Sequence, residues 1–217
     1  MRSWLLAACL LVAAPLAAEG TPLTWLSGTQ GWESTPMEEL DLQALGSGGE
    51  GRTLAGIGGQ WGLLDELQAS GQWEGPVPRV GDPDAELGLR LREPYFPDDR
   101  PAFSVYGRAP YLKGAWSAWG GIAADWEPLD SDLALNAELG DDGSWRLRGG
   151  LWTPYVATTL RLGFEASWLN ASAEALTPQI LVNAPGDLSF QAGLRYGVQD
   201  HSELWTLCLS YELFPNP

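Results

Sequence analysis

Apolar and polar residues alternate along most of the chain beyond residue 37. Alternation with a period of two predicts β-strands, because successive side chains of a strand point to opposite faces. The alternation is most regular over 87–92, 133–139, 160–168, 188–196 and 205–213. Weaker segments lie near 38–46, 53–61, 66–74, 102–109, 115–126, 144–152 and 178–183. Breakers rich in Gly, Pro and Asp separate them. The pattern predicts a single all-β domain over residues 37–217.

The two faces of these strands favour a closed antiparallel transmembrane β-barrel of about 12 strands over a soluble barrel or sandwich. One face is apolar, and the other carries small or neutral polar residues such as Gly163, Ser167 and Thr206. A soluble barrel would turn its apolar face inward and show a charged exterior. Nine aromatic residues share the apolar phase near strand ends, as interfacial girdles do: Trp61, Trp73, Trp116, Trp126, Trp145, Trp168, Tyr196, Trp205 and Tyr211. Trp119 and Trp152 break this phase, and a bulge at Gly149-Gly150 would re-aim Trp152.

The first residues have the form of a secretory signal peptide. A cationic start at Arg2, an apolar stretch and small residues up to Ala18 precede the polar Glu19. A membrane anchor is the alternative, but a spanning helix needs ~20 apolar residues. We therefore expect a signal peptide over 1–18, an irregular arm over 19–36 and export to the outer membrane of a Gram-negative bacterium.

The composition narrows the possible partners. The chain has 12 Lys+Arg against 28 Asp+Glu, which disfavours nucleic acid as a ligand. It also has 27 Gly and 12 Trp, which suits a membrane barrel. Metal-ligand spacing of Cys and His and phosphate-binding glycine loops are absent from the sequence, so we expect no cofactor. The expected partners are outer-membrane lipid, the barrel-assembly machinery and small solutes.

One turn carries a family resemblance. The stretch Trp61-Gly62-Leu63-Leu64-Asp65-Glu66-Leu67-Gln68 resembles a Tyr-Gly-Leu-Thr-Asp-Arg-Leu-Glu turn, with Leu64 and Glu66 departing from it. That turn occurs in transporter-like outer-membrane barrels, many grouped as the MetA-pathway phenol-degradation family. Residues 178–213 are also similar to the last strands of that family. The resemblance implies passage of small, often hydrophobic compounds and no catalytic residues.

Charged residues on the non-lipid face are the candidate site. Seven of the eleven arginines take this phase, together with several glutamates. The set is Arg90, Arg92, Arg108, Arg146, Arg148, Arg161 and Arg195, with Glu86, Glu138 and Glu165. Neighbouring strands would pair Arg108 with Glu86, Arg146 with Glu138, and Arg148 with Glu165. Such a set could form a charged constriction that selects solutes, or a salt-bridged plug.

Catalytic chemistry has little support in the sequence. His201 is the one histidine, and adjacent Ser202 would point to the other side of a strand. Pairs such as Asp141/Asp142 could bind Ca²⁺, although Asp is common in turns. We expect a small-solute channel or transporter-like barrel without catalytic activity. The alternatives are a lipid- or peptide-hydrolysing enzyme, or a closed structural or adhesive barrel.

Overall fold

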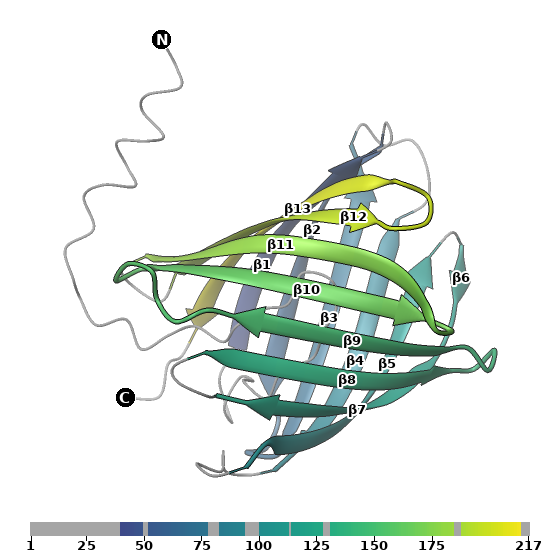
Figure 1. The fold of residues 1–217 in the computed structure, drawn as a ribbon, viewed down its shortest axis with the longest axis horizontal. Helices are drawn as coiled ribbons and strands as arrows, with labels where there is room; N and C mark the ends of the chain where they lie inside the picture. The colour runs from purple at the N-terminus through teal and green to yellow at the C-terminus, as the bar shows by residue number, and fades with distance from the viewer. Residues whose placement is uncertain are drawn as a thin grey trace.

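The computed structural model describes residues 40–49, 52–77, 83–93, 100–112, 114–127, 131–184 and 188–213. The signal peptide and the N-terminal arm lie outside these ranges and stay predictions. The described residues form strands joined by turns and loops (Figure 1). They contain no helix long and apolar enough to span a membrane.

The strands follow one another in chain order. The first seven are β1 (Leu40–Gly49), β2 (Arg52–Gly62), β3 (Leu67–Pro76), β4 (Asp84–Arg92), β5 (Ala102–Leu112), β6 (Ala115–Trp116) and β7 (Trp119–Trp126). The remaining six are β8 (Asp132–Gly140), β9 (Trp145–Trp152), β10 (Leu160–Leu169), β11 (Ser172–Ala184), β12 (Leu188–Gly197) and β13 (Glu203–Leu213).

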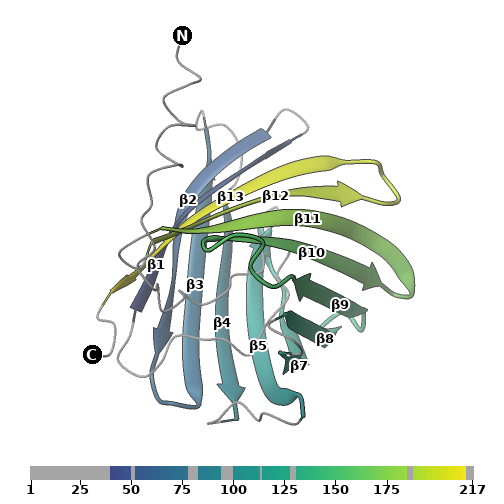
Figure 2. The same ribbon diagram turned by 60° about the vertical axis from the view of Figure 1, so that its left-hand side comes forward.

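The sheet closes on itself. All pairs are antiparallel, and β1 joins β13 in register from Leu40 opposite Leu213 to Gly48 opposite Trp205. Both β6 and β7 pair with β5, so they are two pieces of one strand interrupted after Trp116. The result is the predicted closed, twelve-stranded antiparallel barrel, a continuous curved wall in Figure 2. β1 begins and β13 ends at one rim, which we call the near rim; the opposite one is the far rim.

The predicted strands all occur, and one is longer than expected. The sequence suggested a strand over 178–183, whereas β11 covers Ser172–Ala184. Pro178 made its first half look like a break, because proline cannot donate to a strand ladder. The barrel accommodates it by a gap, since the pairing of β11 with β12 skips residues 177 and 178.

The strand faces divide as the alternation predicted. Large apolar side chains on the outer face are exposed on every side of the barrel, among them Leu42, Ile57, Leu89, Ile122, Leu135 and Leu209. All nine girdle aromatics are among these exposed side chains. Polar side chains fill the inner face and many are buried, among them Gln43, Gln68, Asn136, Thr177, Gln191 and Ser210. An apolar exterior around a polar interior is the arrangement of a barrel in lipid.

The inward position of Trp152 corrects the sequence interpretation. No bulge occurs at Gly149-Gly150, because β9 stays in register with both β8 and β10. Trp152 has the same phase as Arg148, and its ring is fully buried with Ala134 and Leu181. A side chain at Gly163 would leave no room for this ring.

We predict that a charge on the outer face impairs the barrel far more than one on the inner face. Leu209 lies near the middle of β13 with 43% of its side chain exposed outward. Leu209→Arg should cost ~2–4 kcal/mol in a bilayer. Gln72→Arg is the matched control, because Gln72 is an exposed residue of β3 in the inward phase of buried Gln68. Urea unfolding in lipid vesicles measures both, and equal losses would contradict the assigned faces.

We also predict that Gly163→Ala destabilises the barrel. An added Cβ would lie 2.6 Å from two ring carbons of Trp152. Overpacking of this kind typically costs about 1–3 kcal/mol. In Gly107→Ala the new Cβ would meet nothing closer than 3.9 Å, so this control should unfold close to the wild-type urea midpoint. Similar midpoints for the two variants would mean that Trp152 does not pack against Gly163.

Candidate functional site

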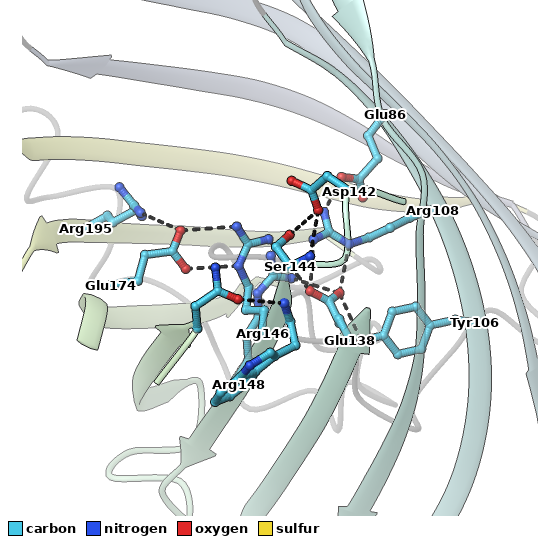
Figure 3. A network of polar contacts seen from close by, with 12 residues as sticks. Glu86, Tyr106, Arg108, Glu138, Asp142, Ser144, Arg146, Arg148, Glu174 and Arg195 are labelled. Atoms are coloured by element: carbon cyan, nitrogen blue, oxygen red, sulfur yellow. Dashed lines mark hydrogen bonds and ion pairs between the residues drawn. The ribbon is translucent and has the colours of Figure 1, made fainter. Parts of the chain in front are cut away.

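A network of arginines and glutamates lines the inner wall near the far rim (Figure 3). Its members come from six of the eight consecutive strands that run from β4 to β12 around the barrel. Most lie toward the far end of their strands, and Tyr106 and Arg148 lie near the middle of theirs. The members are Glu86 on β4, Tyr106 and Arg108 on β5, Glu138 on β8, Arg146 and Arg148 on β9, Glu174 on β11 and Arg195 on β12. The network therefore extends over eight of the twelve strands around the barrel.

Glu138 is the centre of the network. Its side chain is 0% exposed, and its two oxygens accept hydrogen bonds from Arg108 Nε at 2.8 Å and Nη2 at 3.0 Å. The hydroxyl of Tyr106 donates to Oε1 at 3.0 Å. Arg148 Nη1 is 3.5 Å and Arg146 Nη1 3.8 Å from the same carboxylate. A buried carboxylate stays charged only when nearby donors and cations compensate for its lost hydration. Through these contacts Glu138 links β8 to β5 and β9.

The two ends of the network reach water. Glu86 accepts a hydrogen bond from Arg108 Nη1 at 2.9 Å, and its side chain is 24% exposed. At the other end Glu174 is 24% exposed and lies between Arg146, 3.0 Å from its Nε, and Arg195, 3.6 Å from its Nη2. Arg195 is 31% exposed. The two ends of the network are therefore solvent-accessible, whereas its centre at Glu138 is not.

Trp119 departs from the phase of the lipid-facing aromatics, and its ring contacts two arginines of the network. It lies on the inner face of β7 opposite Arg108 on β5. The guanidinium carbon of Arg146 is 4.5 Å from a ring centroid of Trp119, and that of Arg108 is 5.5 Å away. Cation–π contacts of this kind favour a fixed guanidinium orientation. The inward tryptophan thus belongs to the arginine network rather than to a girdle.

The β8–β9 turn adds negative charge at the far rim. Asp142 Oδ1 accepts hydrogen bonds from the Ser144 hydroxyl at 2.5 Å and from its amide at 2.8 Å. These bonds hold the pKa of Asp142 below its usual value. The positive charge of Arg146 lowers this pKa slightly further, so the carboxylate stays ionised.

The other predicted arginines lie outside the network. Arg161 on β10 pairs with Asp132 on β8 at 2.5 Å, and Arg90 donates to Ser104 at 3.2 Å. Arg92 donates from Nε to the carbonyl of Asp65 in the β2–β3 turn at 3.0 Å. All three are near-rim residues, so the seven arginines do not form one ring.

The predicted pairs are only partly observed. Arg108 meets Glu86 as expected, and Arg146 approaches Glu138 more loosely. Arg148 was expected to pair with Glu165, but its ion pair is with Glu138. Glu165 accepts a hydrogen bond from Gln179 at 2.8 Å, and Gln179 accepts one from Gln191 at 2.7 Å. This buried relay links β10, β11 and β12.

The sequence interpretation missed Glu174, because residues 172–177 were left out of the predicted strand. The register of β11 against β10 shifts between Ser167 opposite Ala175 and Trp168 opposite Ala173. Glu174 is the extra residue of this bulge. Extending the alternation of 178–183 back through Thr177 and Ala175 would have brought Glu174 into the strand.

The geometry around His201 does not form a dyad with Ser202. Ser202 Oγ donates to Asp200 at 2.8 Å, whereas His201 Nδ1 contacts the Tyr196 hydroxyl at 2.6 Å. The histidine and the serine therefore engage different partners. Within the described ranges, no group of three or more His, Cys, Asp or Glu side chains could hold a metal ion.

Comparison with known proteins identifies the fold. No protein-family model and no curated protein matches the sequence, so the MetA-pathway resemblance is not confirmed. Solved porins superpose well at very low identity. The KdgM porin gives a TM-score of 0.61 at 8% identity, covering 80% of this chain and 98% of the porin. The NanC porin gives 0.60 at 10%, covering 80% and 100%. The KdgM porin in complex with oligogalacturonate gives 0.60 at 8%, covering 80% and 98%. The chain has the fold of bacterial outer-membrane porin barrels.

We predict that Glu138→Gln strongly destabilises the barrel. The change would leave Arg108 and Arg148 without their shared buried carboxylate, and breaking a buried pair typically costs about 3–5 kcal/mol. Glu86→Gln removes a carboxylate from the exposed Glu86 end of the network. Arg108 retains its ion pair with Glu138 in this variant, so the loss of stability should be clearly smaller. Urea unfolding in vesicles compares the two. Equal losses would mean that Glu138 is not the structural centre of the network.

Proposed function

We propose that this barrel is an outer-membrane channel for small hydrophilic solutes, without catalytic activity. The observation that carries the proposal is the contrast between the two sides of the lumen. On β2 and β4 the inward positions include Gly56, Gly58 and Gly88, and on β3 the inward Ser70 and Gln72 are exposed. The inward side chains of β8–β10, across the ring, are mostly buried. A water-filled path along β2–β4 accounts for this difference.

The exposed Arg195 end of the arginine network supports a preference for anionic solutes. Arg195 presents its guanidinium group to the lumen, whereas Asp125, Asp132 and Glu165 are buried. A porin of the same fold was solved in complex with oligogalacturonate, an acidic oligosaccharide. In this proposal buried Arg148 and Arg161 stabilise the wall of the barrel, and exposed Arg195 attracts solutes.

A closed structural barrel is the second candidate. The buried relay from Gln191 through Gln179 to Glu165 fills part of the lumen with side chains. If similar contacts completed the cross-section, no path would remain. Conductance separates the two candidates.

We predict that the purified full chain conducts ions in a planar bilayer and passes anions more readily than cations. Arg195→Gln should lower this preference, seen as a shift of the reversal potential in a salt gradient. Arg148→Gln should instead lower the urea midpoint, because it leaves buried Glu138 with one partner fewer. A folded wild type without conductance would favour the closed barrel. If the wild type conducts and Arg195→Gln has the same selectivity, Arg195 does not set the anion preference.

A further inference from the structure

The bulge in β11 brings a carboxylate into the lumen that strand alternation would place in lipid. Ala175 and Thr177 face inward and are buried, so a regular strand would turn Glu174 outward. The extra residue between the pairs Ser167–Ala175 and Trp168–Ala173 reverses this. Re-aiming a side chain is a known use of β-bulges. The strand thus gives up a regular ladder at one point, and Glu174 gains contact with two arginines.

Arg146 holds Glu174 by one hydrogen bond and one ion-pair contact. Its Nη2 donates to Oε1 at 3.3 Å, and its Nε lies 3.0 Å from Oε2 without hydrogen-bond geometry. The guanidinium carbon of Arg146 also lies 4.5 Å from a ring centroid of Trp119, a cation–π contact that stabilises its position. Arg195 Nη2 approaches Oε1 from the other side at 3.6 Å. The two arginines form a preorganised seat for one carboxylate.

This seat is accessible from the lumen. The side chains of Glu174 and Arg195 are 24% and 31% exposed, while that of Arg146 is 14% exposed. Each lies within three residues of the far end of its strand. An acidic solute at the far rim could therefore reach Arg195 first and take the place of Glu174 without unpairing either arginine.

We infer that Arg146 and Arg195 form a binding site for the carboxylate group of acidic solutes, and that Glu174 occupies it as an internal competitor. The inference rests on the proposed channel function and names a residue that sets its selectivity. A tethered competitor acts at an effective concentration on the order of millimolar or above. The site then binds acidic solutes weakly, and weak binding lets a solute leave as readily as it enters.

The test measures binding of glucuronate, a sugar carboxylate, with glucose as its neutral counterpart. Titration calorimetry on the full chain in detergent should show weak glucuronate binding to the wild type and about tenfold tighter binding to Glu174→Gln. The factor follows if the competitor leaves the site open for a tenth of the time. Glucose should bind neither protein. Glu174→Asp keeps the charge on a shorter side chain and should give a smaller gain; it replaces the glutamine variant if that one does not fold.

Two controls separate the site from a general charge effect. Glu203→Gln removes one negative charge from an exposed position at the same rim and should leave glucuronate affinity at the wild-type value. Glu174→Gln combined with Arg195→Gln should lose the gain. Equal affinity of wild type and Glu174→Gln, or an equal gain in Glu203→Gln, would overturn the inference. Calorimetry needs no ion flow, so a barrel that binds glucuronate as expected but does not conduct would refute only the channel.

Discussion

Closure of the sheet is the constraint on which the rest of this structure depends. Within hydrocarbon there is no water to bond backbone N–H and C=O groups, so a sheet with a free edge cannot persist there. Pairing of β1 with β13 and of β4 with β5 leaves the ring without an edge. Once the ring is closed, every strand has one lipid face and one interior face, and the alternation of the sequence follows from that division.

Closure also concentrates polar and charged side chains in a narrow interior. The polar and charged groups are satisfied in different ways on the two sides of the barrel. On the β8–β10 side, guanidinium and carboxylate groups satisfy each other around Glu138, so few of them need water. On the β2–β4 side, glycine and exposed neutral polar residues line the path proposed for water. The proposed channel therefore has one ion-paired wall and one hydrated wall.

The sequence predicts the parts of this structure that follow from local alternation. Strand number, strand phase and the inward position of the arginines come from a period of two, which each strand obeys by itself. The partners of the arginines do not, because the register between neighbouring strands decides which side chains meet. Arg148 therefore meets Glu138 rather than Glu165. Features that interrupt the period were also hidden: the bulge at Glu174 and the proline inside β11. Trp152 departs from the apolar phase in the sequence, and the bulge expected to re-aim it does not occur, so it points inward.

The pairing of β1 with β13 has a consequence for biogenesis. β1 pairs with β2 and with β13, and Leu40 is opposite Leu213 in the second pair. The second pairing of β1 can therefore form only when β13 is present. Until then two sheet edges stay open, and an open edge is a template for pairing with other chains. Closing so long a loop is entropically costly and slow. The interval between the synthesis of β1 and its pairing with β13 is therefore the period in which this sheet is most open to pairing with other chains.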